Sequence, residues 1–378
     1  MRLDALRLWN FRNFAQAEIV PDPRMNVLVG ANAQGKTNLL EAIYYLSTLK
    51  PLRPIKESDL VRWGASEARL SACFTRDAFQ ESVQIRLVAG GKRILMLNEQ
   101  PLTRQSGWGG ILAVVCFTSQ DLQIVQGEPA DRRRFLDTEI SLLSSRYLYS
   151  LAQYRRVLEQ RNNLLRTHAE GDATLESLPE WNAQLVKYGA RLLSARKQFL
   201  ERLNPFAQSV HDALTAGGER IELRYLPGVP VPLPTQDYLP EKEEDWAEVF
   251  AGALRARETE EIQRGTTLLG PHRDDFLICV NGVEARLFAS HGQQRTCVLS
   301  LRLSEVPLIE SLRDEPPVVL LDDVFSDLDP PRRARLVAYL HPRVQIFLTC
   351  TDLSFFEPQV LDTSALFVVE AGQVRRDD

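Results

Sequence analysis

Hydrophobic residues in the first third of the chain form short runs separated by polar residues, a pattern that predicts strands joined by turns. The runs are Leu3–Leu8, Val27–Val29, Arg69–Phe74, Ser82–Val88, Ile94–Leu97 and Ile111–Phe117. Glycine pairs at residues 90–91 and 109–110 supply turn signals between them. A helical stretch at residues 38–46 follows one of these runs. Residues 1 to about 120 therefore predict a mixture of strands and helices.

The pattern changes near Pro129, where apolar residues begin to recur at the spacing of an α-helix. The predicted helical stretches are Arg132–Leu165, Trp181–Leu214 and Glu241–Arg257. A polar break at residues 168–179 and a proline-rich loop at residues 227–240 separate them. These stretches are too short for an extended coiled coil. They predict a compact helical module.

Strands and turns return from Thr266 onward. A hairpin is predicted over Phe276–Phe288, because the dipeptide Asn281-Gly282 is favoured in tight type I′ turns. The helical module is thus inserted into an α/β domain whose two halves are far apart in the sequence. We assign residues 1–125 and 260–378 to the α/β domain and residues 126–259 to the inserted helical domain.

The composition is that of a globular protein, and 378 residues suffice for two or three domains. A net charge of −5 argues against a generally basic nucleic-acid coat, although it leaves room for a local basic patch. The five cysteines are scattered without a C-x-x-C pair, which indicates a reducing compartment, no disulfide and no structural zinc. No apolar run has the length of a membrane span, and the first residues do not resemble a secretory signal. We therefore expect a cytoplasmic protein with no membrane partner.

The octad GANAQGKT, Gly30 to Thr37, lies between the apolar run at residues 25–29 and the helical stretch at residues 38–46. A G-x-x-x-x-G-K-[ST] octad between a strand and a helix predicts a site for a nucleoside triphosphate. Backbone N–H groups and the helix N-terminus would bind the phosphates. Lys36 would reach the β- and γ-phosphates, and the Thr37 hydroxyl would bind Mg²⁺. The predicted nucleotide contacts are Gly30, Ala31, Asn32, Ala33, Gln34, Gly35, Lys36, Thr37 and Asn38.

A second part of this site is predicted after the apolar run at residues 316–321, which is typical of a strand buried on both faces. Asp322 and Asp323 follow the run, at the end of the strand where open α/β sheets bind ligands. Asp322 would hold Mg²⁺ opposite Thr37. Asp323 would orient or deprotonate the attacking water, so it and Lys36 are the predicted catalytic residues. The alternative is a strand that ends in a solvated acidic turn.

A third motif, Ser290-His291-Gly292-Gln293-Gln294-Arg295, precedes a helical stretch that runs from Thr296 to about Leu312. A serine and a glycine at a helix N-terminus make an anion site, with free N–H groups, the helix dipole and a hydroxyl donor. One chain rarely needs two such sites for one nucleotide. We therefore expect this motif to meet the γ-phosphate of a nucleotide held by another subunit. The alternative is an ordinary N-capped helix.

These three motifs, with Ser326-Asp327-Leu328-Asp329 after the acid pair, resemble the head of an ABC-type ATPase. Four further blocks are similar to the RecF family of bacterial recombination mediators, and the resemblance covers essentially the whole chain. The blocks are LWNFRNF at 8–14, QGKTNLLEAIY at 34–44, DRRRFLD at 131–137 and GPHRDDF at 270–276. The fold that the resemblance implies is α/β, an ABC-type P-loop ATPase head with an inserted α-helical domain.

The resemblance also implies an ATP-dependent DNA-binding ATPase that forms a head-to-tail homodimer around two nucleotides. The dimer would bind duplex or gapped DNA without reading its sequence, and would act with RecR and RecO to load RecA in recombinational repair. The residues implied by position are Ser290, Gly292 and Gln293 as signature contacts in trans, Asp329 as the D-loop residue, Arg12 as a nucleotide contact and Gln120 as the Q-loop glutamine that senses Mg²⁺. Gln123 is an alternative for the Q-loop. Residues 349–352 (TCTD) occupy the switch position, where ABC proteins often carry histidine.

Two positions depart from the related proteins. Many relatives have glycine where Ala33 stands, and alanine is tolerable there only if φ is negative, because a Cβ atom penalises left-handed conformations. The second acid is Asp323, whereas transporter-type ABC proteins use glutamate, which is one methylene longer. We therefore expect the base to be poorly placed, and hydrolysis to be slow, until the dimer closes.

Arginines make the first half of the helical module locally basic, and their guanidinium groups suit phosphate oxygens without sequence readout. They are Arg132, Arg133, Arg134, Arg146, Arg155, Arg156, Arg161 and Arg166, of which Arg132, Arg133, Arg155 and Arg156 are the DNA candidates. A rival patch consists of Lys187, Arg191, Arg196 and Lys197. The alternative is a solvated helix face whose arginines pair with neighbouring acids.

Other functions share parts of this pattern. A nucleotide-binding subunit of an ABC-type transporter would lack the helical insertion and would need a membrane partner. An SMC-type protein would carry a long coiled coil at the insertion point. A nucleotide-gated DNA clamp with incidental hydrolysis would have the same motifs as a DNA-coupled ATPase.

Overall fold

The computed structural model describes residues 1–76, 78–102, 108, 110–172, 174–231, 239–341 and 343–377. The chain forms two compact units. The first unit comprises Met1–Asp121, Ser209–Gly218 and Val298–Asp378, and the second comprises Leu122–Gln208 and Glu219–Cys297. The predicted boundary between residues 259 and 260 differs from this division, because residues 260–297 belong to the second unit.

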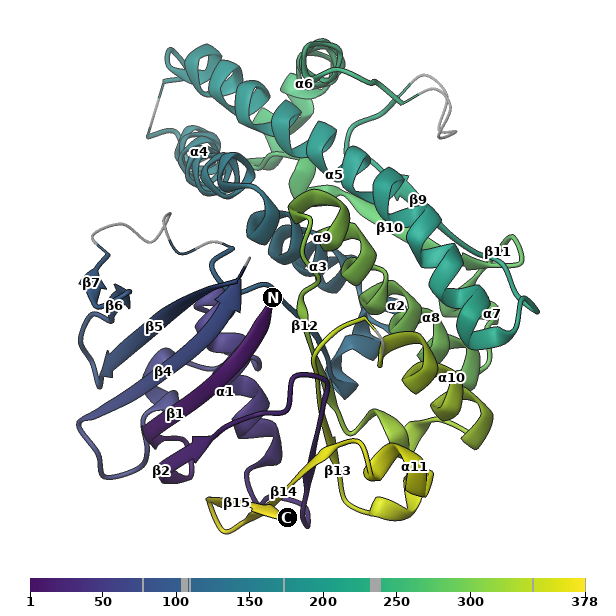
Figure 1. Ribbon diagram of the computed structural model, residues 1–378. Coiled ribbons are helices and arrows are strands. Elements are labelled where there is room, and N and C mark those ends of the chain that lie inside the picture. The colour runs from purple at the N-terminus through teal and green to yellow at the C-terminus, as the bar shows by residue number, and fades with distance from the viewer. Residues whose placement is uncertain are drawn as a thin grey trace. The chain divides into compact units, whose positions relative to one another are not determined.

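The first sheet of the first unit has the strand order β2-β1-β4-β5-β6-β7, and all its strand pairs are antiparallel (Figure 1). Its strands are β1 (Arg2–Phe11), β2 (Phe14–Ile19), β4 (Glu67–Arg76), β5 (Phe79–Val88), β6 (Ile94–Leu97) and β7 (Gln100–Pro101). Alternate residues such as Leu6, Leu8 and Leu70 are buried, because successive side chains of a strand point to opposite faces. One face of this sheet therefore belongs to the core.

The second sheet of the first unit has the strand order β15-β14-β3-β13-β12-β8. Its strands are β3 (Met25–Val29), β8 (Val114–Phe117), β12 (Val318–Asp322), β13 (Ile346–Cys350), β14 (Ala365–Glu370) and β15 (Gln373–Asp377). All neighbours pair in parallel except β14 and β15. The three central strands β3, β13 and β12 are almost wholly buried, as strands covered on both faces are. Their carboxyl ends share one edge of the sheet, so residues after β3 and β12 can meet there.

Helix α1 (Lys36–Thr48) connects the two sheets of the first unit, since it packs against β1, β4 and β5 of one and β8, β12 and β13 of the other (Figure 1). Its residues Leu39, Leu40 and Ile43 are completely buried. The other helical segments of this unit are η1 (Glu57–Leu60), η3 (Ser119–Leu122, whose last residue is in the second unit), α9 (Glu305–Arg313), η6 (Val324–Asp327), α10 (Pro330–Leu340), η7 (Leu353–Phe355) and α11 (Pro358–Leu361).

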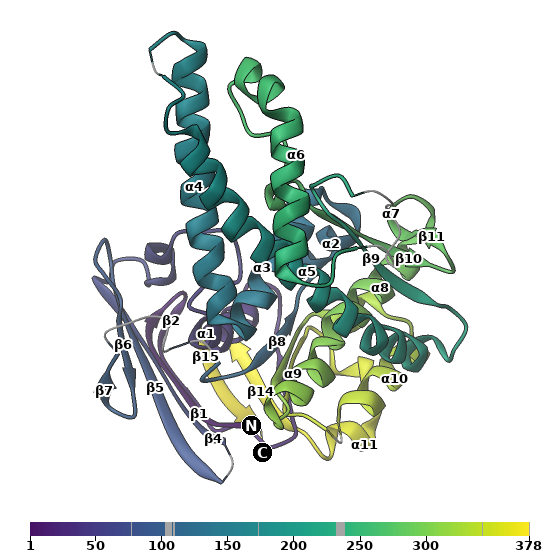
Figure 2. The ribbon, with the colours of Figure 1, turned by 90° about the horizontal axis from the view of Figure 1, so that it is seen from above.

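The second unit is mainly helical, as predicted. Its helices are α2 (Gln123–Gln126), α3 (Pro129–Leu143), α4 (Ser145–Ala169), α5 (Leu178–Thr215), α6 (Glu243–Arg264), η5 (Pro271–Arg273), α7 (Ala285–Phe288) and α8 (His291–Leu303), and the ends of α5 and α8 enter the first unit. Helices α4 and α6 lie side by side (Figure 2). The stretch predicted as one helix from Arg132 to Leu165 is two, because Ser144 has φ −142° and ψ 107° and its side chain caps α4.

A three-stranded antiparallel sheet completes the second unit, with the order β11-β10-β9. Its strands are β9 (Ile221–Leu226), β10 (Asp275–Val280) and β11 (Val283–Glu284). The predicted turn at Asn281-Gly282 is confirmed, with φ of 51° and 84°. The predicted extent to Phe288 is wrong, because α7 begins at Ala285. Residues 232–238 of the proline-rich loop lie outside the described residues.

No helix in the described part of the chain combines the length and the apolar character needed to cross a membrane.

Candidate nucleotide site

The phosphate loop joins β3 to α1, as predicted, and its two glycines, Gly30 and Gly35, have no room for a side chain. A Cβ atom on Gly30 would lie 2.2 Å from the carbonyl oxygen of Val369. Gly35 has φ 121°, and a Cβ atom there would lie 2.6 Å from Nδ2 of Asn13. Glycine therefore lets the Val369 carbonyl approach the loop at one position and the Asn13 side chain approach it at the other.

Ala33 has φ 65°, which lies in the left-handed region. The condition set from the sequence for a tolerable alanine, a negative φ at this position, is therefore not met. Alanine adopts such angles only at an energetic cost, because its Cβ atom crowds the following carbonyl oxygen. The loop thus contains a strained residue next to the phosphate-binding backbone.

Two neighbouring turns hold the phosphate loop in place. Asn13, between β1 and β2, donates from Nδ2 to the Gln34 carbonyl over 2.8 Å, and its Oδ1 accepts from Nδ2 of Asn38 over 2.8 Å. On the other side, the backbone N–H of Ala371 donates to Gln34 Oε1 over 2.7 Å, and that of Gly372 donates to the Gln34 carbonyl over 3.1 Å. The sequence motifs did not identify Asn13 or the β14–β15 turn as parts of the site. An Ala-Gly turn between two short strands was the available signal.

The side chain of Lys36 lies on the loop that it follows. Its Nζ donates to the carbonyl oxygens of Gly30 over 2.6 Å and Ala31 over 2.8 Å. Burial lowers the pKa of Lys36, and the nearby negative charge of Asp323 opposes that shift. The ammonium group is therefore already placed at the phosphate loop, where it makes two bonds that a phosphate oxygen can replace.

Thr37 and Asp322 meet across the sheet edge, as the sequence predicted. The Thr37 hydroxyl donates to Oδ1 and Oδ2 of Asp322 over 2.9 and 3.0 Å. Burial raises the pKa of Asp322, and hydrogen bonds from Thr349 and Thr37 oppose the rise. A hydroxyl and a carboxylate at this place are the hard oxygen ligands that Mg²⁺ prefers.

Asp323 is exposed and has the left-handed angles φ 53° and ψ 31°. Its backbone N–H donates to Oγ1 of Thr349 over 2.8 Å. Asp329 follows as the N-cap of α10, where its carboxylate accepts from the backbone N–H of Arg332 over 2.9 Å. The Asp329 side chain remains 48% exposed. Both predicted acids are thus accessible at the end of the sheet that carries the phosphate loop.

Arg12 makes other contacts in this structure than the nucleotide contact implied by the resemblance. Its Nε donates to Oε2 of Glu41 over 2.6 Å, and its Nη1 donates to the Asp59 carbonyl over 3.1 Å. Glu41 lies on α1 and is only 2% exposed, so the ion pair is a largely desolvated one. Arg12 therefore contacts the helix that begins at the phosphate loop.

Both glutamines considered for the Q-loop are exposed. Gln120 lies on η3, shortly after β8 of the sheet that carries the phosphate loop. The neighbouring Asp121 accepts from the Thr118 backbone N–H over 2.7 Å and pairs with Arg302 over 2.6 Å, which fixes the turn. Gln123 begins α2 in the second unit.

The motif around Ser290 lies in the second unit, at the N-terminus of α8. The Ser290 N–H donates to Oε1 of Gln293 over 2.9 Å, and the Gln293 N–H donates to Oγ of Ser290 over 3.3 Å. This reciprocal capping is the local structure of an ordinary helix start. Gln293 also donates from Nε2 to Glu219 over 2.9 Å, whereas Ser290 and Gly292 are exposed. The motif is therefore a capped helix start whose serine and glycine are exposed.

The DNA candidates on α3 prove to be structural. Arg132 is 5% exposed and donates to both carboxylate oxygens of Asp275 over 2.6 and 2.9 Å. Arg133 donates to the Asp274 carbonyl over 2.7 Å, and burial lowers its pKa. The prediction that Arg132 and Arg133 contact DNA phosphates is therefore wrong. Their guanidinium groups instead bond the sequence block at residues 131–137 to the block at residues 270–276.

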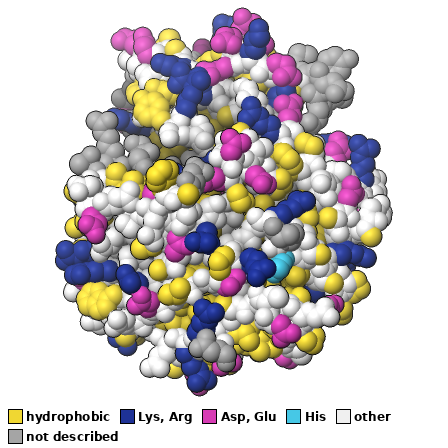
Figure 3. All heavy atoms as spheres, viewed as in Figure 1, with side chains coloured by type: hydrophobic (Ala, Val, Ile, Leu, Met, Phe, Trp, Pro, Cys, Tyr) yellow, Lys and Arg dark blue, Asp and Glu magenta, His cyan; other side chains and the backbone are white. Residues whose placement is uncertain are grey.

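Arg155 and Arg156 on α4 remain exposed. Arg155 is 66% exposed while it pairs with Asp137 over 2.9 Å. Positive and negative side chains are interspersed over the face shown in Figure 3. Exposed arginines of this kind can exchange a carboxylate for a phosphate oxygen.

The rival basic patch is half buried. Arg196 is 2% exposed and pairs with Asp137 and Asp274 over 2.7 and 2.5 Å. Lys197 is also 2% exposed and pairs with acidic side chains of Glu201 and Glu241. These two residues stabilise the second unit and leave only Lys187 and Arg191 of the patch near its surface.

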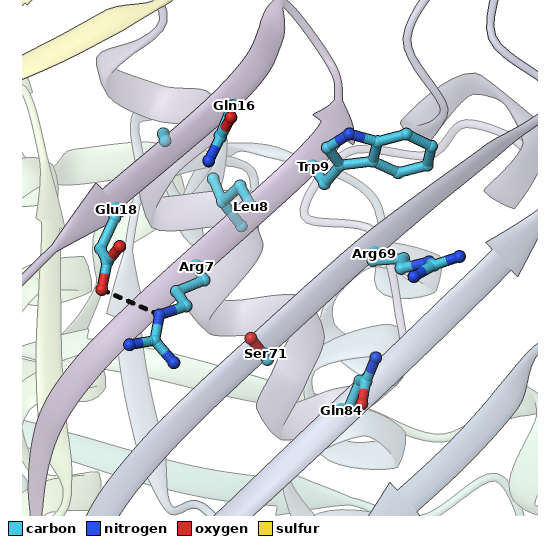
Figure 4. A pocket seen from close by; sticks show the side chains of 9 residues that line it. Arg7, Leu8, Trp9, Gln16, Glu18, Arg69, Ser71 and Gln84 are labelled. Carbon is cyan, nitrogen blue, oxygen red and sulfur yellow. Dashed lines mark hydrogen bonds and ion pairs between the residues drawn. The ribbon is translucent and has the colours of Figure 1, made fainter.

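A groove of about 270 Å³ lies on the outer face of the first sheet, and the sequence motifs did not indicate it. Arg7 and Trp9 of β1 and Arg69 of β4 line it (Figure 4). The Arg69 guanidinium lies 5.3 Å from the centroid of the Trp9 ring, and Arg7 pairs with Glu18 over 2.8 Å. The signal in the sequence was the alternation along β1, in which Leu8 is buried while Arg7 and Trp9 on either side of it point outward. The groove contains none of the nucleotide motifs.

The parallel sheet, the phosphate loop after β3 and the acid pair after β12 define an ABC-type P-loop ATPase head. The RecF/RecN/SMC N terminal domain model matches residues 2–373. The DNA replication and repair protein RecF of Heliobacterium modesticaldum is 39% identical over 381 residues, with 100% of both chains covered. RecF of Synechococcus sp. (strain JA-3-3Ab) is 40% identical, with 99% of this chain and 97% of the relative covered. The chain therefore belongs to the RecF family.

Solved structures agree with this assignment. The recombination mediator protein RecF-ATPrS of the RecFOR pathway has a TM-score of 0.89 at 30% identity, with coverage of 100% of this chain and 98% of that chain. The corresponding RecF-ATP structure has a TM-score of 0.88 at 31% identity with the same coverage. A Smc head domain from Pyrococcus furiosus has a TM-score of 0.55 at 16% identity, which shows a shared fold alone. The chain is thus an ATPase of the ABC/SMC type and the recombination-mediator class, and these relatives do not favour a transporter subunit.

Proposed function

We propose that this chain closes on duplex or gapped DNA as an ATP-dependent head-to-tail homodimer and helps to load the recombinase in recombinational repair. The observation that carries the proposal is the hydrogen bond from Thr37 to Asp322. It brings the phosphate loop and the acid pair, 285 residues apart in sequence, to one edge of one sheet. The RecF-ATP neighbours support ATP as the nucleotide.

The hydrolytic site follows from the groups at this edge. Thr37 and Asp322 would hold Mg²⁺, which when bound supplies positive charge to the β- and γ-phosphates. Lys36 would exchange its two carbonyl acceptors for phosphate oxygens. Asp323, exposed after β12, would orient or deprotonate the attacking water. Because this acid has a short side chain, we expect slow turnover until closure positions it.

Residues of the partner subunit would complete the nucleotide site. Ser290 and Gly292 are exposed at the N-terminus of α8, where a hydroxyl, free N–H groups and the helix dipole favour an anion. We infer that they contact the γ-phosphate held by Lys36 of the partner subunit. Asp329 and Gln120, both exposed, would form the D-loop contact and the Mg²⁺ sensor. ATP would thus act as part of the dimer interface.

DNA contacts are assigned to Arg155 and Arg156 on α4. Both are exposed, and contacts from arginine to backbone phosphates give affinity without sequence readout. The structural neighbours belong to the RecFOR pathway. We therefore propose RecR and RecO as partners of this chain as well.

Sedimentation velocity with and without ATP and Mg²⁺ tests the dimer. Ser290→Arg should leave ATP binding intact and abolish the dimer, because the larger charged side chain obstructs the contact in trans. Ser145→Arg is a matched control, since Ser145 is also an exposed serine at a helix N-terminus, that of α4, and it should still dimerise. An ATP-dependent dimer of Ser290→Arg would show that the assignment of this motif is wrong.

A further inference from the structure

Thr349 joins the two acids of the site through one hydroxyl group. It lies on β13, where it pairs in register with Asp322 of β12 on one side and with Leu28 of β3 on the other. Its side chain is completely buried. The hydroxyl donates to Oδ1 of Asp322 over 2.8 Å and accepts from the backbone N–H of Asp323 over 2.8 Å. Thr349 is therefore the residue through which the strand between β3 and β12 contacts both acids.

The bond to Asp323 supports an unusual backbone conformation. Asp323 has φ 53° and ψ 31°, a left-handed conformation that is unfavourable for a residue with a side chain. The Thr349 hydroxyl is the acceptor for its N–H group, and loss of an acceptor leaves a polar group unsatisfied. The side chain of Thr349 thus helps to fix the direction in which Asp323 leaves the strand.

The bond to Asp322 differs from the one that Thr37 makes. Two hydroxyl groups donate to this carboxylate, one from α1 and one from β13. In the proposed function the Thr37 hydroxyl would be a ligand of Mg²⁺, and its bond to Asp322 would then be given up. Thr349 is not one of the predicted Mg²⁺ ligands, so its bond to Asp322 can persist. It is therefore the donor that can keep the Asp322 carboxylate oriented.

We propose that Thr349 is a positioning residue that orients Asp322 toward Mg²⁺ and holds the backbone of Asp323. The inference rests on the proposed roles of the two acids. This role of Thr349, holding the two acids in position, differs from the switch role that was considered for residues 349–352 from the sequence. Groups that orient a metal ligand typically change metal affinity by about 10- to 100-fold when they are removed.

The test compares Thr349→Val, which keeps the shape but has no hydroxyl, with Thr349→Ser, which keeps the hydroxyl. Binding of ATP carrying a methylanthraniloyl fluorophore is measured in EDTA and at increasing Mg²⁺. Thr349→Val should bind as the unaltered chain does in EDTA, but should need about tenfold more Mg²⁺ for the half-maximal change. Thr349→Ser should need within threefold of the original concentration. Thr75→Val is the matched control, because the Thr75 hydroxyl also donates to an aspartate, Asp4, over 2.6 Å.

Equal losses of affinity in EDTA and in Mg²⁺ would show a purely structural role and overturn the inference, as would a Thr349→Ser variant that behaves like valine. If Thr349→Val does not fold, Thr349→Cys replaces it, and a normal Mg²⁺ requirement in that variant overturns the inference. Asp322→Asn separates this failure from failure of the proposed function. If that variant loses its response to Mg²⁺ while Thr349→Val keeps it, only the role of Thr349 is wrong. If the unaltered chain shows no response to Mg²⁺, the proposed metal site itself is wrong.

Discussion

Replacing Ala33 by glycine should stabilise the protein, although glycine substitutions usually destabilise. Ala33 has φ 65° and is exposed, so no packing is lost with its methyl group. A left-handed conformation costs an L-residue about 1–2 kcal/mol relative to glycine. The greater conformational freedom of glycine in the unfolded chain offsets about 0.5–1 kcal/mol of this gain. The expected net gain is about 0.5–1 kcal/mol of unfolding free energy.

Urea unfolding without nucleotide, followed by circular dichroism, measures this gain as a higher midpoint. Ala31→Gly is the matched control in the same loop, because Ala31 is also exposed but has no positive φ. The control should lose about 0.5–1 kcal/mol, since glycine there only adds freedom to the unfolded chain. Equal destabilisation by both substitutions would refute the strain argument and the left-handed geometry on which it depends.

Two further predictions concern the second unit. Arg161→Met should lower the unfolding free energy, measured by urea unfolding, by about 3–5 kcal/mol, because it leaves its buried partner Glu261, at 2.6 Å, without a counter-charge. The double variant with Glu261→Met should recover part of this loss. A double variant that recovers none of it would contradict this account. Burial lowers the pKa of His272 to about 4 from the ordinary 6.5, so the folded state binds the proton less well than the unfolded state. The neutral histidine therefore contributes up to about 3 kcal/mol to the unfolding free energy. This stability is fully present above pH 6.5 and is lost as the pH falls toward 4. His272→Gln should flatten the pH dependence of stability over that range, and an unchanged slope would argue against a neutral buried histidine.

The nucleotide site was largely predictable from the sequence, because its chemistry is concentrated in contiguous motifs. The octad from Gly30 to Thr37 identified a strand, a loop and a helix at once, and Asp322 followed from its place after a buried apolar run. The Thr37 to Asp322 contact confirms that the two motifs meet. What sequence patterns do not contain is the set of neighbours that approach from elsewhere in the chain, such as Asn13 and the turn at Ala371.

The charged residues of the second unit show the same limit in another form. Arg132 and Arg155 look alike in sequence, since both lie in a basic helical stretch. Only the fold distinguishes them, because Asp275, 143 residues away, takes up the guanidinium of Arg132. Likewise, the hairpin turn at Asn281-Gly282 was predictable from a local preference. The early end of its second strand depended on the start of α7.

The central claim is that ATP closes this chain on DNA, and fluorescence anisotropy of a labelled duplex tests it most directly. The unaltered chain, Lys36→Met and Ser290→Arg are titrated with and without ATP and Mg²⁺, beside a double variant with Arg155→Gln and Arg156→Gln. We predict binding that requires ATP, that both single variants lose, and that the double arginine variant weakens with a shallower salt dependence. Equal binding by all variants under all conditions would contradict the claim, because the DNA site would then be independent of nucleotide and dimer.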